Sequence, residues 1–159
     1  MRPFIAKEVP REDFDLYLII RQVVEALPDE ELNLGQFEVD GTKVVMTCHL
    51  LARAVSVVLG LEFQDGNFYQ ICDHSWVLTK AGNIVDVYPV GAWGPSLVWN
   101  DPCFSVGKWL YKPVANFSTE SPELKLEDPG FRESVLTVVT ALVETMDRLK
   151  IEPPFKPVF

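Results

Sequence analysis

The feature that most constrains this chain is the stretch from Val44 to Leu59, which is apolar almost all round. Its main polar interruptions are Thr47, His49, Arg53 and Ser56. A helix with so little polar face is usually central and buried among other elements. We therefore expect the rest of the chain to pack around a helix in this stretch.

The ends of this helix are marked by residues with capping preferences. Thr47 is suited to the N-cap position, because its hydroxyl accepts from backbone N–H groups about one turn ahead. Cys48 is then the first helical residue. Gly60 is suited to end the helix, because glycine adopts the left-handed conformation found there.

Two amphipathic helices are expected to flank this central one. The first opens with the acidic turn Arg11-Glu12-Asp13, shows apolar residues at three- and four-residue spacing, and ends at Pro28. The second spans Phe131–Lys150 and has the clearest apolar stripe in the chain. Together with a strand-rich middle they predict a single α+β domain covering residues 1–159.

The expected strands and connections follow from alternation and from Gly/Pro breaks. Residues 29–43 form a connection with a short strand at Gln36–Val39. Phe68–Ile71 and His74–Thr79 are interpreted as one strand with a bulge, and Ile84–Tyr88 as the next. The remaining segments are a loop at Val90–Pro102, a third strand at Val106–Val114, a loop at Asn116–Gly130 and an extended, polyproline-like tail at Glu152–Phe159.

The link between the two strands that follow Cys72 decides which side chains share a face. A three-residue Lys80-Ala81-Gly82 loop with left-handed Gly82 pairs Thr79 with Asn83 and His74 with Tyr88. Asp86 is then the diagonal neighbour of His74 on the same face. A two-residue Ala81-Gly82 turn puts the two side chains on opposite faces, and the sequence leaves both turns open.

Cys48, His74 and Asp86 have the residue types of a nucleophile, its base and an orienting carboxylate. A free thiol has a pKa of roughly 8.5, and a helix start or a nearby imidazolium lowers it. His74 would pair with the thiolate and protonate a leaving amine, and Asp86 would fix the histidine tautomer. The Cys48 backbone N–H plus one side-chain donor would hold an oxyanion, with Gln36 as the best candidate for that donor and Asn33 behind it.

Three segments of the chain together resemble the motifs of a known enzyme family. They are Thr47-Cys48, His74-Ser75-Trp76 and Val85-Asp86-Val87-Tyr88-Pro89. Over the roughly 40 residues from Cys48 to Pro89 the chain resembles the transglutaminase-like branch of the papain-like cysteine enzymes. The resemblance implies a Cys-bearing helix packed on an antiparallel sheet and acyl transfer through a thioester. The chain departs from the family's pattern after Cys48, where His49-Leu50 stands in place of the usual Trp or Tyr, and in lacking a glycine-rich surrounding.

Other residues have simpler interpretations. Cys72 faces the same side as His74, as a core residue or as a neighbour of the site, and Cys103 is incidental. His49 is interpreted as a surface or capping histidine, because it points about 100° away from Cys48 on the helix. A zinc site made of Cys48, His49, Cys72 and His74 is an alternative, although structural zinc ligands favour wider spacing.

Tryptophans and an acidic composition complete the expectations. Trp76 should flank the site because it shares the face of His74, and Trp93 is a candidate cleft wall.

A net charge of −9 without a basic cluster argues against nucleic-acid partners. No signal peptide, no membrane span and three cysteines favour a cytoplasmic protein, bacterial or phage, or one exported without a cleavable signal.

The function expected from these residues is that of a thiol-dependent amide hydrolase or acyltransferase, of protease, deamidase or transglutaminase type. Its substrate would be a protein, a peptide or a small amide, and no cofactor is expected. The alternatives are a non-catalytic binding or regulatory module that retains the fold, and the zinc-binding protein described above.

Overall fold

A computed structural model describes residues 10–27, 36–39, 42–45, 47–68, 72–86, 97–99, 111–114 and 126–152. For 36–39, 42–45, 72 and 97–99 it describes the backbone alone. The elements are α1 (Arg11–Glu25), β1 (Gln36–Val39), β2 (Thr42–Val45), α3 (Cys48–Leu59), β3 (Glu62–Phe68), β4 (Cys72–Leu78), β5 (Ile84–Asp86), β6 (Leu97–Trp99), β7 (Tyr111–Pro113) and α6 (Pro129–Leu149).

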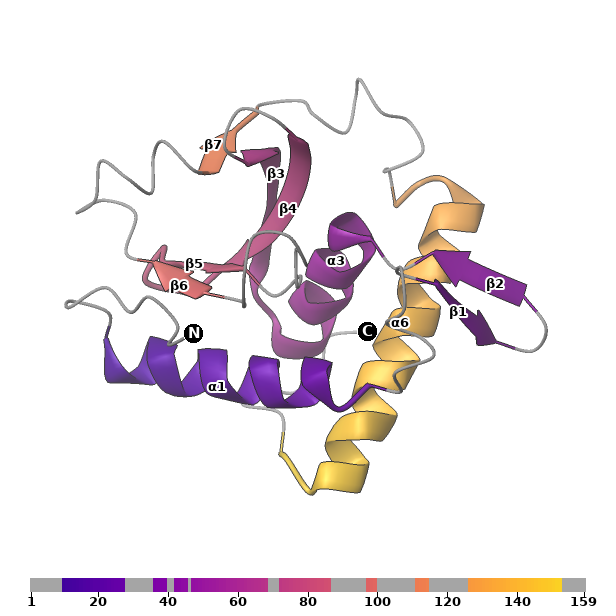
Figure 1. The fold of residues 1–159 in the computed structure, drawn as a ribbon, viewed down its shortest axis with the longest axis horizontal. Coiled ribbons are helices and arrows are strands. Elements are labelled where there is room, and N and C mark those ends of the chain that lie inside the picture. The colour runs from indigo at the N-terminus through magenta and orange to yellow at the C-terminus, as the bar shows by residue number, and fades with distance from the viewer. Residues whose placement is uncertain are drawn as a thin grey trace.

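The architecture is α+β, as expected. Five antiparallel strands form a sheet in the order β6-β5-β4-β3-β7, and β1 and β2 form a separate hairpin. Helix α3 lies between the strands β3 and β4 on one side and α6 on the other, with α1 running below (Figure 1). The helix that begins at buried Cys48 therefore packs on an antiparallel sheet and has N- and C-terminal helices beside it.

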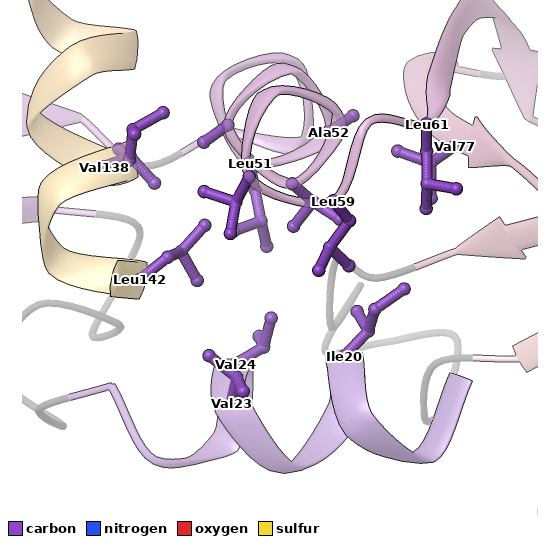
Figure 2. Packing of buried hydrophobic residues seen from close by; sticks show 14 of the residues in the cluster. Ile20, Val23, Val24, Leu51, Ala52, Leu59, Leu61, Val77, Val138 and Leu142 are labelled. Atoms are coloured by element: carbon purple, nitrogen blue, oxygen red, sulfur yellow. The ribbon is translucent and has the colours of Figure 1, made fainter. Parts of the chain in front are cut away.

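The main core surrounds α3, and nine of the twelve residues of this helix are buried. Leu51 and Leu59 of α3 meet Val23 and Val24 of α1 and Leu142 of α6 (Figure 2). Removing aliphatic side chains of this size from water stabilises a fold by about 1.5–3 kcal/mol each. The all-round apolar pattern of the Cys48 helix is explained by this central position.

The opposite face of the sheet carries a second, aromatic cluster. It consists of Phe68, Trp76, Ile84 and Tyr111, with Leu78 packed against it. Val77 and Val85 belong instead to the main core. Side chains alternate between faces along a strand, so residues 74, 76 and 78 face the aromatic cluster while 75 and 77 face α3.

Three boundaries differ from the sequence expectations. Phe68–Ile71 and His74–Thr79 are not one bulged strand, because Glu62–Phe68 pairs as its own strand with Cys72–Leu78. The polar sequence Gln64-Asp65-Gly66-Asn67 concealed β3, since its polar groups are bonded inside the structure. The expected Val90–Pro102 loop contains β6, and β2 at Thr42–Val45 is a strand just before the central helix where none was expected.

Several expectations are confirmed within the described residues. Gln36–Val39 is a strand and α1 ends before Pro28. The expected C-terminal helix is present as α6, although it begins two residues before Phe131, at Pro129 behind the N-cap Asp128, and ends at Leu149. The expected third strand is described only at its end, as β7, and residues 106–110 lie outside the described part. The rest of the Asn116–Gly130 loop and the tail from residue 153 also lie outside it, and the extent of the domain stays a prediction.

Candidate active site

Cys48 is the first residue of α3, as the capping pattern predicts. Thr47 is the N-cap, in an extended conformation, and its Oγ1 accepts a hydrogen bond from Leu50 N at 3.2 Å. The helix ends at Gly60, which has a left-handed φ of 62°. The thiol therefore sits at the positive end of a helix dipole, which favours its ionised form. Cys48 is buried, with 9% of its surface exposed.

The β4–β5 hairpin has the three-residue loop. Thr79 N donates to Asn83 O, Gly82 N donates to Thr79 O, and Gly82 has a φ of 81°. Val77 pairs with Val85 and Leu78 with Ile84. In this register His74 and Asp86 share a face, and His74 Nε2 lies 2.8 Å from Asp86 Oδ2. The two-residue turn is excluded.

A buried carboxylate from α1 holds this loop in place. Asp13 Oδ2 accepts from Thr79 Oγ1 at 2.8 Å and from Asn83 Nδ2. Thr79 Oγ1 in turn accepts from Asn83 N at 3.1 Å. These three side chains are all buried. The loop conformation that aligns His74 with Asp86 is thus tied to a helix 66 residues earlier in the chain.

Asp86 receives a second donor from β7. The hydroxyl of Tyr111 donates to Asp86 Oδ2 at 2.8 Å. Burial, followed by the negative charge of Asp86, raises the pKa of Tyr111 well above its ordinary value, so this hydroxyl keeps its proton. The rings of Tyr111 and Phe68 pack beside the His74 ring, with centroids 6.3 Å and 5.6 Å away.

Trp76 lies next to His74, as expected, with ring centroids 6.2 Å apart. It is fully buried, and its Nε1 donates to Gln64 Oε1 at 3.2 Å. Trp76 therefore supports the imidazole from within the aromatic cluster and is not a solvent-facing cleft wall.

A second polar network approaches Cys48 from the α3 face of the sheet, and the sequence interpretation missed it. His49 Nδ1 lies 2.6 Å from Ser75 Oγ, and Ser75 donates to Asp65 Oδ1. Asp65 accepts two hydrogen bonds from Arg53, at 3.0 Å and 2.7 Å. The interpretation of His49 as a surface histidine is wrong, because only 14% of its side chain is exposed. The signal for this network in the sequence was Arg53, a charged residue one helical turn after His49 in an otherwise apolar helix.

The electrostatics favour a thiolate. Burial would raise the pKa of Cys48, but hydrogen bonds with His49 and with His74 outweigh burial and bring the pKa down to about 6. Burial would lower the pKa of His74, yet its bonds to Asp86 and Cys48 raise that pKa to about 10. These two pKa shifts favour, at neutral pH, a Cys48 thiolate beside a protonated His74.

Other candidates from the sequence lie outside what the structure describes. Gln36 is on β1, where only the backbone is described, and Cys72 likewise has no described side chain. Asn33, Trp93 and Cys103 lie outside the described residues altogether. The oxyanion donor therefore stays a prediction.

Metal and membrane features were searched in the described part of the chain. Among those side chains no group of three or more Cys, His, Asp or Glu residues is arranged to hold a metal ion. The zinc alternative includes Cys72 and stays a prediction, which elemental analysis of purified protein would test. No helix in the described ranges is long and apolar enough to cross a membrane.

Comparisons with protein-family models, with curated proteins and with solved structures each found no match to this chain. The architecture on which the resemblance depends is present, with a buried Cys at the start of a helix on an antiparallel sheet. No family is shown for this chain by these comparisons, and the transglutaminase-like resemblance stays a prediction.

Proposed function

We propose that this chain is a thiol-dependent amide hydrolase or acyltransferase of the transglutaminase-like kind, acting through a thioester on Cys48. The observation that carries the proposal is the 2.8 Å contact of His74 with Asp86 beside a Cys48 thiol at a helix N-terminus. Nucleophile, base and orienting group in hydrogen-bond reach are the signature of nucleophilic catalysis.

Each residue has a defined role in this chemistry. The Cys48 thiolate attacks a carbonyl carbon, forming a C–S bond and a tetrahedral oxyanion. His74 gives its proton to the leaving amine as the C–N bond breaks, which leaves an acyl thioester. Water or an acceptor amine then attacks the thioester and loses a proton to His74, and Cys48 leaves as thiolate. Asp86, which also accepts a hydrogen bond from Tyr111, holds Nε2 of His74 by a hydrogen bond. The other ring nitrogen of His74 is then the one that exchanges a proton with the thiol.

The substrate class follows from the nucleophile and not from a shaped pocket. A protein or peptide amide, a glutamine side chain or a small amide would each suit a thioester mechanism. A carboxamide substrate with water as acceptor gives deamidation, and an amine acceptor gives transfer. The reaction subtype is decided by which acceptor reaches the thioester.

The decisive experiment follows the Cys48 thiol directly. Iodoacetamide labelling is measured across pH, and the modified cysteine is located by peptide mass analysis. Cys48 should reach half its maximal rate near pH 6, matching its lowered pKa, against roughly 8.5 for a free thiol. If the three cysteines react alike and with the pH dependence of a free thiol, the proposal fails.

A second experiment tests turnover without knowledge of the natural substrate. The activated ester 4-nitrophenyl acetate should acylate Cys48 in a burst, visible as nitrophenolate release and as an acetyl mass on the Cys48 peptide. His74→Ala should slow the later loss of that acetyl group, because no base remains to activate water. Cys48→Ala is the control and should show no burst.

A non-catalytic binding or regulatory module is the second candidate, and the burial of Cys48 and His74 favours it. They are only 9% and 2% exposed. Such a module would keep the fold while Cys48 stays unlabelled by iodoacetamide until the protein is denatured. Labelling of Cys48 in the native protein near pH 6 argues for the enzyme.

A further inference from the structure

His49 is a partly buried, titratable residue next to the nucleophile in the chain, and the mechanism above does not use it. It follows Cys48 in α3, and its side chain lies in the polar network on the α3 face of the sheet. Both His49 and His74 lower the pKa of the Cys48 thiol. The cysteine therefore has two imidazoles as neighbours, one from its own helix and one from β4.

The hydrogen-bond directions decide where His49 carries a proton. Ser75 Oγ–H donates to Asp65 Oδ1. The same hydroxyl has no second proton, so at its 2.6 Å contact with His49 Nδ1 it must accept. Nδ1 of His49 therefore carries a proton. Asp65 Oδ1 lies 3.9 Å from Nδ1, which adds a direct attraction for a charged ring.

The buried charges around Cys48 can be matched one to one. Asp65 is neutralised by Arg53, whose two terminal nitrogens both donate to it, and Arg53 is 1% exposed. Asp86 is neutralised by His74. His74 then faces two negative charges, that of Asp86 and that of a Cys48 thiolate, and among the described residues the charges balance only when His49 is also protonated. Buried charges need such partners, because an uncompensated one is costly.

We infer that His49 is the counter-ion of the Cys48 thiolate, held as an imidazolium by Ser75 and Asp65, while His74 is the residue that moves protons. This inference rests on the proposed function and divides its site into a charge-holding histidine and a proton-transferring one. Hydrogen bonding to Asp65 and Cys48 overcomes burial and raises the pKa of His49 to about 9, which agrees with this role.

The consequence for the reaction concerns the steps in which His74 is neutral. After His74 has given its proton to the leaving amine, its positive charge is gone. His49 keeps its proton, so a cation remains beside the sulfur when the thioester breaks and Cys48 leaves as thiolate. His49 is thus a positioning residue for charge, and no bond to substrate is assigned to it.

Within the described part of the chain, the groups known to face His49 come from three elements, and all of them bear on its titration. Cys48 and Arg53 are on its own helix, Asp65 is on β3, and Ser75 is on β4. His74 acts on it through the shared thiol. A test must therefore change His49 without changing the Arg53–Asp65 pair.

The test is the pH profile of Cys48 alkylation by iodoacetamide in His49→Gln, His74→Ala and the double variant. Each single variant should raise the apparent thiol pKa, and a rise by one pH unit should slow the reaction near pH 6 about fivefold, because the thiolate fraction falls from about one half to about one eleventh. At alkaline pH the limiting rate should be unchanged or higher, since a more basic thiolate is a better nucleophile. The double variant should titrate like a free thiol. Ser56→Ala, a hydroxyl loss on the same helix away from the cluster, is the control and should match wild type.

The outcomes separate this inference from the proposed function. A wild-type thiol with ordinary acidity overturns both. A wild-type thiol acidic near pH 6 whose profile is unchanged in His49→Gln overturns the inference alone. If His49→Gln does not fold, as judged by circular dichroism, Ser75→Ala decides. That variant keeps His49 but removes its link to Asp65, so a raised thiol pKa supports the inference and an unchanged one overturns it.

Discussion

The two arms that meet at Cys48 differ in how they are built. The first arm is His74 and Asp86 of the β4–β5 hairpin together with Tyr111 of β7, which pairs with β3. Its carboxylate accepts from one ionised and one neutral donor. The second arm consists of His49, Ser75, Asp65 and Arg53, which come from α3, β3 and β4. It ends in an ion pair in which Arg53 donates two hydrogen bonds to Asp65.

This difference separates two tasks that a single histidine usually combines. In the first arm the counter-charge of Asp86 is a titratable imidazole, so the charge state of the pair can change during a reaction. In the second arm the counter-charge of Asp65 is the Arg53 guanidinium, which is bonded to it through both terminal nitrogens and takes no part in proton transfer. Asp65 therefore stays ionised and keeps His49 protonated. The first arm suits proton transfer, and the second suits a constant electrostatic environment.

The largest expected effect comes from breaking the second arm at its carboxylate. Asp65→Ala leaves the guanidinium of Arg53 buried without its ion-pair partner, which costs about 3–5 kcal/mol. Chemical denaturation should show this loss in the free energy of unfolding. The matched control is Asp73→Ala on the adjacent strand, where the residue is exposed and its carboxylate is bonded to Asn67. That control should change stability by less than about 0.5 kcal/mol.

A smaller loss in the free energy of unfolding is expected from the first arm, because the residue removed there, Tyr111, is neutral. Tyr111→Phe removes the hydroxyl that donates to Asp86 and leaves His74 in place. A hydrogen bond to a charged group contributes about 1.5–3 kcal/mol, and denaturation should show a loss in this range. A loss as large as that of Asp65→Ala would remove the energetic distinction between the arms.

Gly66 offers a way to disturb the first arm without touching any of its polar groups. Gly66 pairs with His74 across β3 and β4, and an added Cβ would collide with the Lys112 carbonyl and come within 2.8 Å of Trp76 Cη2. Gly66→Ala should cost about 1–3 kcal/mol, the usual range for overpacking. It should also shift the Cys48 alkylation profile, because β7 carries Tyr111. Gly130→Ala, whose nearest contact is 3.4 Å, should cost nothing and leave the profile unchanged.

The acid limb of the stability curve should report on the second arm. Bonds to His49, Arg53 and Ser75 overcome burial and depress the pKa of Asp65 far below its ordinary value. The unfolded chain then binds a proton that the folded protein does not, so this contribution is present above about pH 4 and is lost as pH falls. Denaturation midpoints measured at decreasing pH should drop more steeply in wild type than in Asp65→Asn. Equal slopes would mean that the pKa of Asp65 is not depressed.

Much of the first arm could be predicted from the sequence because its contacts are local. The Thr47 cap, the Gly60 terminator and the Lys80-Ala81-Gly82 loop are each determined by a few adjacent residues with strong backbone preferences. His74 and Asp86 are separated by 12 residues, and strand alternation alone relates them once the loop length is known. The choice between a two- and a three-residue loop was settled by Asp13, which lies far away in the sequence and bonds Thr79 and Asn83.

The second arm was decided by tertiary structure. His49 and Ser75 are 26 residues apart, and nothing in their local sequence relates a helix residue to a strand residue. Asp65 lies in a segment whose polar composition does not resemble a strand, so its burial depends on Arg53 of α3 being packed against it. The sequence by itself determined the helix that begins at Cys48 and the two strands that carry His74 and Asp86, but not the length of the loop between them. Only the packing of that helix on the sheet decided the place of His49. Helical geometry suggested a surface position, but the side chain is partly buried near the Cys48 thiol.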